Sequence, residues 1–597
     1  MQKTHQYSSL KILLQLVPYV ATMKLRLLVS LIATLATISF SLIIPFILKT
    51  IVTTLSHAQQ TSPLLLSFLL IGYGFSWTAN QLISQLRILF ACQILERGKR
   101  SITLHTFDHL LALSPRFHAD RQTGALTSYL DKAQHGFETI FWSIFIFLLP
   151  TTLELMITII IFSTLFGPLY GLILAFIMVG YLLFSLKTIT KTNQARELFN
   201  EKSAQATAKI VDSLLNYETV KYFNNQMYEH TQADTLLKQQ EEASIKLFNL
   251  DMNIQIGQLL IIGIGLSSII WLAGNAVYQG TISLGNFVLI NGYLLQFIMP
   301  LNYLSNTIYQ ARKGLQDVKT IIELLHLEPE IKYKNSSPPC TPNKPTLSFK
   351  NVSFKYQSND RTILKNISFS VPSGTTTAIV GPSGSGKSTL AKLIFRFYDI
   401  TKGTILLNNH DIKAFGQEAL HKQIGIVPQD IPLFNHTLYY NIAYASPHAS
   451  EQQVLEAAQQ ACLESFINSL PKGYMTLVGE RGLKLSGGEK QRIALARLIL
   501  RQPSLYIFDE ATSSLDSRTE QKIQQNLTLL AHEKTTLIIA HRLSTIIHAD
   551  QIIVLDQGQI VECDTHTRLL QQHGLYAQLW NKQQQSFTSS HNIKETP

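Results

Sequence analysis

Residues Gly381–Thr389, GPSGSGKST, decide the fold of the second half of the chain. They follow the apolar run Thr377–Val380 and precede a predicted helix near Thr389, which is the strand–loop–helix setting of a phosphate-binding loop. Glycines let backbone N–H groups approach phosphate oxygens, and a helix N-terminus adds partial positive charge. The predicted nucleotide-binding residues of this loop are Gly381, Ser383, Gly384, Ser385, Gly386, Lys387, Ser388 and Thr389. We expect Lys387 to reach the β- and γ-phosphates and Ser388 to offer a hydroxyl to Mg²⁺.

Two acids follow a second apolar run further along the chain. Residues 505–510, LYIFDE, predict a buried strand that ends in Asp509 and Glu510. Asp509 is expected to hold Mg²⁺ directly or through water, and Glu510 to orient and deprotonate the attacking water. The alternative is a pair of surface acids after a strand, and the phosphate-binding loop upstream argues against it.

A second candidate phosphate site lies between these two motifs. Residues 485–489, LSGGE, open a helix that continues as KQRIALARLIL. A serine and two glycines at a helix start, here Ser486, Gly487 and Gly488, can bind a phosphate group. From about Leu347 onward, short apolar runs alternate with amphipathic helices and Gly-rich turns, so the sequence predicts an α/β ATPase domain over residues 347–582.

The first half of the chain has a different composition. Hydrophobic residues make up 46% of the whole sequence and charged residues 15%, which fits a chain partly dissolved in lipid. An apolar helix needs about 20 residues to cross a bilayer. Six stretches qualify, and Glu154 is the only charged residue in them. They are residues 27–48, 64–86, 139–162, 165–186, 254–278 and 284–304.

Loop charges set the orientation of these spans. The short connections 49–63, 163–164 and 279–283 carry a single basic residue, Lys49, whereas the two long connections carry seven and eight Lys or Arg residues. Both termini are therefore predicted in the cytoplasm. The long connections keep helical periodicity over residues 195–215 and 229–250, which predicts stalks beyond the bilayer, with solvated loops as the alternative.

The remaining segments complete a predicted domain plan. We expect an N-terminal cytoplasmic segment (1–26), an all-α six-helix transmembrane domain with stalks (27–310), a linker (311–346) and a disordered tail (583–597). The net charge is +11, but the basic residues flank apolar spans and do not form one basic face, so no nucleic-acid partner is expected. The four cysteines are scattered, which argues against a disulfide framework or a metal cage.

The order of the three motifs resembles the nucleotide-binding domain of ABC transporters. The resemblance implies that Tyr356 stacks on adenine, that Gln429 in VPQD senses Mg²⁺, and that His541 contacts the γ-phosphate. It also implies that 514–516, SLD, communicates between two sites. One copy of each motif resembles a half-transporter, so a homodimer is expected, in which the LSGG helix of one copy closes the ATP site of the other. Glu489 replaces the more usual glutamine.

The fused membrane domain and 478–482, VGERG, resemble the exporter class. Segments 117–126, FHADRQTGAL, and 216–225, NYETVKYFNN, are similar to the mitochondrial and bacterial heavy-metal-tolerance ABC exporters, a family associated with glutathione-related compounds. The implied substrate residues are Gln255, Gln258, Asn302 and Ser305. Interhelical polar packing is the alternative for these amides.

Three further residues have open roles. Lys132 and His135 stand where relatives have arginines, which weakens the fixed positive charge for an anionic cargo. Glu154 is an intramembrane acid, hence a functional candidate, with a helix-locking hydrogen bond as the alternative.

The leading hypothesis is an ATP-driven exporter of glutathione derivatives or related thiol or metal conjugates, with ATP and Mg²⁺ as cofactors and a small-molecule cargo. A lipid or multidrug exporter is the second hypothesis. An ATP-gated channel or regulator without pumping is the third. We expect an integral protein of the bacterial inner (plasma) membrane.

Overall fold

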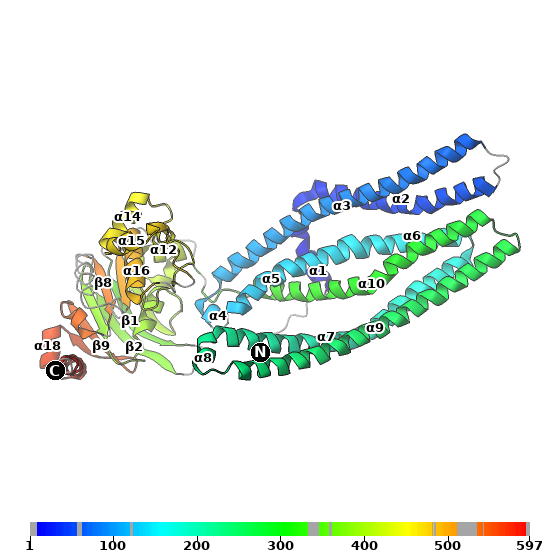
Figure 1. Ribbon diagram of the computed structural model, residues 1–597. Coiled ribbons are helices and arrows are strands. Elements are labelled where there is room, and N and C mark those ends of the chain that lie inside the picture. The colour runs from blue at the N-terminus through cyan, green and yellow to red at the C-terminus, as the bar shows by residue number, and fades with distance from the viewer. Residues whose placement is uncertain are drawn as a thin grey trace. The chain divides into compact units, whose positions relative to one another are not determined.

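The computed structural model describes residues 9–56, 62–119, 123–331, 333, 345–356, 361–479, 482, 485–509, 534–540 and 542–592. The chain forms two compact units, Met1–Leu113 with Phe117–Glu328, and Ser114–Arg116 with Pro329–Pro597. The first unit is helical and the second is α/β, as Figure 1 shows. The predicted fold class is therefore confirmed.

The helical unit is built from very long helices. Its elements are α1 (Ser9–Val20), η1 (Ala21–Met23), α2 (Lys24–Ser56), α3 (Pro63–Ala112), α4 (Pro115–Ala119), α5 (Thr123–Ile140), the π-helical segment η3 (Phe141–Leu148), α6 (Leu149–Leu165), α7 (Pro168–Leu215), α8 (Tyr217–Tyr222), α9 (Gln226–Tyr278) and α10 (Leu284–Leu325). The predicted spans lie in α2, α3, η3 with α6, α7, α9 and α10. The predicted stalks are continuous with the fourth and fifth spans, since α7 runs on to Leu215 and α9 begins at Gln226.

Four helical stretches of the described residues are long and apolar enough to cross a membrane. They are Leu10–Ser56, Leu126–Leu165, Pro168–Thr188 and Gln226–Tyr278, and Leu284–Ile298 is a shorter apolar stretch. The second predicted span, within α3, is more polar because it contains Asn80, Gln81 and Gln85. Many leucine, isoleucine and phenylalanine side chains of these helices are exposed, which suits contact with lipid.

The α/β unit contains two sheets. The first has the order β2-β1-β4-β5 and the second β10-β9-β3-β8-β7-β6. The strands are β1 (Leu347–Lys355), β2 (Thr362–Val371), β3 (Thr376–Val380), β4 (Lys402–Leu407), β5 (His410–Asp411), β6 (Ile424–Val427), β7 (Leu505–Asp509), β8 (Thr535–Ile539), β9 (Gln551–Asp556) and β10 (Gln559–Asp564). The helices are α11 (Lys387–Ile394), η4 (Ile412–Ala414), α12 (Gln417–Gln423), α13 (Leu438–Ala443), α14 (Glu451–Gln460), α15 (Glu464–Ser469), η5 (Gly473–Met475), α16 (Gly487–Arg501), η7 (Leu543–Ile546), α18 (His566–Gln571) and α19 (Leu575–Asn592).

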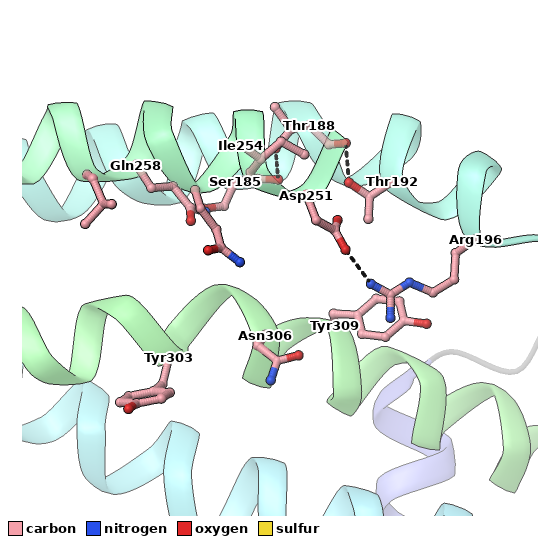
Figure 2. Close-up of a pocket in the computed structure, with 12 residues that line it drawn as sticks. Ser185, Thr188, Thr192, Arg196, Asp251, Ile254, Gln258, Tyr303, Asn306 and Tyr309 are labelled. Carbon is pink, nitrogen blue, oxygen red and sulfur yellow. Dashed lines mark hydrogen bonds and ion pairs between the residues drawn. The ribbon is translucent and has the colours of Figure 1, made fainter. Parts of the chain in front are cut away.

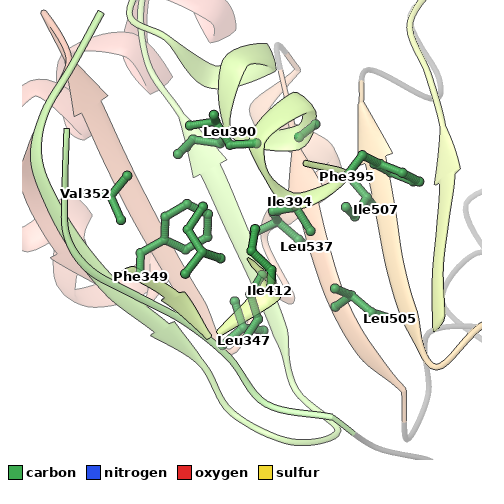
Figure 3. Close-up of a cluster of buried hydrophobic side chains, with 14 of the residues drawn as sticks. Leu347, Phe349, Val352, Leu390, Ile394, Phe395, Ile412, Leu505, Ile507 and Leu537 are labelled. Atoms are coloured by element: carbon green, nitrogen blue, oxygen red, sulfur yellow. The ribbon is translucent and has the colours of Figure 1, made fainter. Parts of the chain in front are cut away.

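One hydrophobic core joins the two sheets around α11. Figure 3 shows Phe349 and Val352 of β1 beside Leu390 and Ile394 of α11, with strands of the second sheet behind them. Burying one such side chain stabilises the fold by roughly 1.5 to 3 kcal/mol. The helix that begins at Lys387 is therefore fixed by its own apolar face.

Two helices run past predicted boundaries. Helix α10 continues beyond residue 311, where the linker is predicted to begin, to Leu325, and it buries Val318, Ile321 and Leu324 on one face. Helix α19 continues beyond residue 583, where the disordered tail is predicted to begin, to Asn592. No Gly or Pro interrupts residues 583–592, so nothing local ends that helix.

Candidate functional site

The predicted nucleotide site lies at one edge of the second sheet. Strands β3, β8, β7 and β6 are parallel neighbours, so their carboxyl ends meet at the same edge. The register aligns Ile379 with Ile539, Ile539 with Asp509, and Val427 with Phe508. The sheet therefore brings the phosphate-binding loop, Asp509 and the segment that holds Gln429 to one place.

The side chains of Asp509 and Gln429 at this edge of the sheet differ in solvent exposure. Asp509 is 7% exposed at the end of β7, and Gln429 is exposed two residues beyond β6. Glu510 and His541 come directly after β7 and shortly after β8, and both lie outside the described residues. Ser514, Leu515 and Asp516 also lie outside them.

The phosphate-binding loop needs glycine for conformation and for space. Gly381, Gly384 and Gly386 have positive φ angles of 153°, 81° and 105°. A Cβ atom on Gly381 would lie 1.9 Å from the carbonyl oxygen of Leu555. The loop can close tightly against β9 only because this side chain is missing.

The polar groups of the loop point to an anionic ligand. Lys387 donates from Nζ to the carbonyl oxygens of Gly381 and Pro382, both at 2.9 Å. Ser385 is 3% exposed, and its buried Oγ has no hydrogen-bond partner within the described part of the chain. Lys387 and the loop N–H groups can therefore surround a phosphate group, for which Ser385 supplies a further donor. Ser388, Gln429 and Asp509 offer hydroxyl, amide and carboxylate oxygens, the ligands that Mg²⁺ prefers.

Tyr356 lies immediately after β1 and beside this loop. Its ring packs edge-on against Phe354 and Tyr398, with centroid distances of 4.8 and 5.1 Å. Its hydroxyl lies 3.4 Å from Oγ1 of Thr389 on α11. This position, next to the phosphate-binding helix, is compatible with the predicted contact with adenine.

The LSGG segment begins α16 as predicted. Ser486 is the N-cap residue, and its Oγ accepts a hydrogen bond from the Glu489 N–H. Glu489 Oε2 in turn accepts a hydrogen bond from the Ser486 N–H at 2.7 Å, which completes a capping box. A glutamine can form the same pair, which explains why a carboxylate is tolerated here. The helix packs against a different hydrophobic core from α11.

A cavity of about 550 Å³ lies between α7, α9 and α10 (Figure 2). The predicted Gln255 and Gln258 line it. Gln258 is 6% exposed and donates from Nε2 to Ser185 Oγ at 2.9 Å. Asn302 and Ser305 lie on α10, and their side chains are outside the described part of the structure. The remaining lining residues are Ser185, Thr188, Thr192, Arg196, Asp251, Ile254, Leu259, Tyr303, Asn306 and Tyr309.

Sequence reasoning missed the charged and aromatic members of this lining. A helical signal was present, because Asp251, Gln255 and Gln258 follow the i, i+4, i+7 spacing of one helix face. Arg196 lies on the same face of α7 as Thr192, but its charge is used in the sequence analysis only to orient the membrane spans. Tyr303, Asn306 and Tyr309 of α10 complete the wall opposite α7 and α9 (Figure 2).

The other candidate residues lie elsewhere. Lys132 and His135 on α5 do not line this cavity. They lie near Asp317 of α10, where burial raises the pKa of the Asp317 carboxyl and the positive charges of Lys132, Lys313 and His135 oppose that rise. Glu154 accepts a hydrogen bond at 2.7 Å from Ser41, which joins α6 to α2. That contact supports the helix-locking alternative.

Comparisons with known proteins match both parts of the chain. Residues 364–513 match the ABC transporter family, and residues 27–301 match the ABC transporter transmembrane region. The iron-sulfur clusters transporter atm1 of Aspergillus fumigatus is 40% identical over 550 residues, which cover 91% of this chain and 76% of that protein. The iron-sulfur clusters transporter ABCB7 of Homo sapiens is 38% identical over 567 residues, which cover 93% and 75%.

A solved structure is similar over almost the whole chain. It is described as a bacterial Atm1-family ABC exporter with ATP bound, and it matches with a TM-score of 0.85 and 37% identity. The match covers 94% of this chain and 99% of that one.

The predicted location requires a correction. A bacterial plasma membrane is contradicted by the curated relatives, because those of Aspergillus fumigatus, Danio rerio, Homo sapiens and Arabidopsis thaliana are named as mitochondrial. Integral membrane character stands, since the transmembrane region is matched. The shared membrane and ATPase regions, at these identities and coverages, place this chain in the Atm1 family of ATP-driven ABC half-transporters.

Proposed function

We propose that the chain exports glutathione derivatives or related thiol or metal conjugates from the side of the membrane that holds its ATPase domain. The cavity between α7, α9 and α10 carries this proposal, because its volume of about 550 Å³ suits a small peptide. Amide, hydroxyl and phenol groups line it, and these groups can hydrogen-bond peptide units. Relatives named as iron-sulfur clusters transporters support a thiol or metal-linked cargo.

The ATP site has a division of roles in this proposal. Tyr356 contacts adenine, and Lys387 with the loop N–H groups binds the phosphates. Ser388, Gln429 and Asp509 would hold Mg²⁺, which would neutralise charge on the phosphate oxygens. Glu510 orients the attacking water and takes its proton, and His541 contacts the γ-phosphate.

The working unit in this proposal is a homodimer in the lipid bilayer. Gly487 and Gly488 lie in the first turn of the capped helix α16, where N–H groups can bind an anion. The triphosphate that this helix start contacts is bound to the phosphate-binding loop of a second copy. Each copy thus closes the ATP site of the other. Two identical sites follow from two-fold symmetry. Nucleotide-driven closure is then passed through the stalks to the membrane helices.

Transport into inside-out vesicles tests pumping. Vesicles with the wild-type protein should accumulate oxidised glutathione when ATP is present, and vesicles with Glu510→Gln should not. An ATP-gated channel would equilibrate the compound without accumulation in either case. Accumulation by Glu510→Gln at the wild-type rate would contradict the proposed role of Glu510.

ATPase stimulation in lipid-reconstituted protein tests the cargo. Oxidised glutathione and metal–glutathione conjugates should stimulate hydrolysis more than lipids or apolar amines. A lipid or multidrug exporter is the second candidate, favoured by an apolar groove of about 630 Å³ that Phe176, Ile177 and Ile261 help to line. Stimulation by lipids alone would select that candidate.

A further inference from the structure

The cavity between α7, α9 and α10 contains one positive and one negative side chain, and they touch. Arg196 of α7 donates from an Nη atom to Oδ2 of Asp251 on α9 at 3.2 Å. All other lining residues are uncharged. The lining therefore has no net charge, but it presents both signs at one end, with Gln258 toward the other end (Figure 2).

Stability alone does not account for this pair. The side chains of Arg196 and Asp251 are 29% and 32% exposed, and ion pairs as exposed as this contribute little to stability. The contact is also through a single nitrogen, whereas arginine and carboxylate form two parallel hydrogen bonds when they are optimised for each other.

Both partners keep unused hydrogen-bonding capacity. The Nε atom of Arg196 is buried and has no hydrogen-bond partner among the described residues. Within that same part of the chain, no hydrogen bond reaches Oδ1 of Asp251. A buried donor without a partner is unfavourable, so a small shift of the Arg196 side chain that gives Nε a ligand acceptor would be favourable.

A third helix fixes the guanidinium in place. Its central carbon lies 4.1 Å from the ring centroid of Tyr309 on α10, within range of a cation–π contact. Figure 2 shows the guanidinium between the Tyr309 ring and the Asp251 carboxylate. The positive and negative groups are thus held side by side on the cavity wall.

We propose that Arg196 and Asp251 together select the zwitterionic head of an α-amino acid in the cargo. The α-carboxylate binds the guanidinium and the α-ammonium binds the Asp251 carboxylate, since an α-amino acid carries both groups on one carbon. This inference rests on the proposed export of glutathione compounds, whose γ-glutamyl end has such a head. It makes Asp251 a specificity-determining residue against ligands that carry only negative charge.

Blocked ligands test the inference on the wild-type protein. The probes are S-methylglutathione, the same compound acetylated on its α-amino nitrogen, and the same compound amidated on its γ-glutamyl α-carboxylate; cystine and N,N′-diacetylcystine form a second pair. The readout is the concentration for half-maximal ATPase stimulation in lipid nanodiscs. Each blocked probe should require a concentration about tenfold higher, the effect of losing one charge-assisted hydrogen bond. Equal concentrations for free and acetylated probes in both pairs would overturn the inference.

Two variants then assign each contact. Asp251→Asn should abolish the preference for the free amine over the acetylated probe, and Arg196→Gln should abolish the preference for the free carboxylate over the amide. The matched control is Asp234→Asn on the same helix, which loses an exposed ion pair with Lys238 and should discriminate as the wild type does. An unchanged preference in Asp251→Asn would contradict the inference.

A failure of the zwitterion proposal can be distinguished from a failure of the proposed glutathione export. Vesicle uptake of S-methylglutathione, compared with Glu510→Gln, reports the proposed export whether or not the amine is read. If uptake fails but cystine still stimulates more strongly than its diacetyl derivative, the zwitterion preference stands and glutathione export falls. If uptake succeeds equally for free and acetylated glutathione compounds, glutathione export stands and the zwitterion preference falls.

Discussion

The two candidate sites of this protein are constructed in different ways. At the ATP site, four parallel strands end in register, and the backbone of the sheet sets where Gly381, Asp509 and Gln429 lie. In the membrane cavity, three separate helices contribute side chains, and helix packing sets their distances. The first site therefore depends on a few residues of fixed type, whereas the second can change its specificity by single side-chain substitutions.

Of the substitutions that test these two sites, Lys387→Ala should change activity most. Loss of the ammonium group that binds the phosphates should lower ATP hydrolysis at least about a hundredfold and abolish transport. Phosphate release from reconstituted protein measures it. Lys392→Ala is the control, because Lys392 is an exposed lysine on the same helix. Persistent transport in Lys387→Ala would break the assignment of the site.

Gly381→Ala tests whether the loop is fixed by the sheet. A methyl group there would meet the Leu555 carbonyl at 1.9 Å and would also hold a positive φ. The expected loss is about 2 to 4 kcal/mol of stability of the ATPase domain. Gly384→Ala is the control, because it has a positive φ of 81° but nothing within 4 Å of the added carbon. Thermal unfolding should separate the two variants, and equal melting temperatures would refute the steric argument.

Gln258→Leu tests the cavity. It removes the hydrogen bond to Ser185 and one polar group of the lining. The cargo concentration for half-maximal ATPase stimulation should rise about threefold to tenfold, which corresponds to about one neutral hydrogen bond. Gln316→Leu on α10 is the control, because Gln316 is exposed and does not line the cavity. An unchanged concentration in Gln258→Leu would favour the packing alternative.

Glu489→Gln gives the smallest expected effect. Glutamine can accept from the Ser486 N–H as Glu489 does, so the capping box is kept. ATPase activity should stay within about twofold of wild type, and the thermal stability of the domain should hardly change. A large gain or loss of activity would show that the carboxylate charge, and not the cap, matters at this helix start.

The same contrast explains how far the sequence could be interpreted. The strand–loop–helix around Lys387 and the start of α16 at Gly487 were predicted, because glycine and capping patterns act locally. Gln255 and Gln258 were also predicted to share a site, since they lie one helical turn apart. The contact of Arg196 with Asp251 and Tyr309 was not predicted, because it joins residues 55 or more positions apart across three helices.

The helix ends differ from the predicted boundaries for a related reason. Residues 311–325 have a buried stripe that continues α10, whereas the linker is predicted from the Pro-rich stretch that follows. Residues 583–592 have no strong apolar face, and yet α19 continues through them. Helix ends are set by what interrupts a helix as much as by what packs against it.

The π-helical segment Phe141–Leu148 has a consequence for the third span as a whole. Its wider i→i+5 turns advance each residue by less than the about 100° of an α-helix, so the two flanking halves are rotated out of phase. The half before it, α5, packs on α3 and α10, and the half after it, α6, packs on α7. The two halves of the third span therefore turn their buried faces in different directions. If the same eight residues formed an ordinary α-helix, Leu155 and Phe162 would turn away from their buried positions while α5 stayed in place.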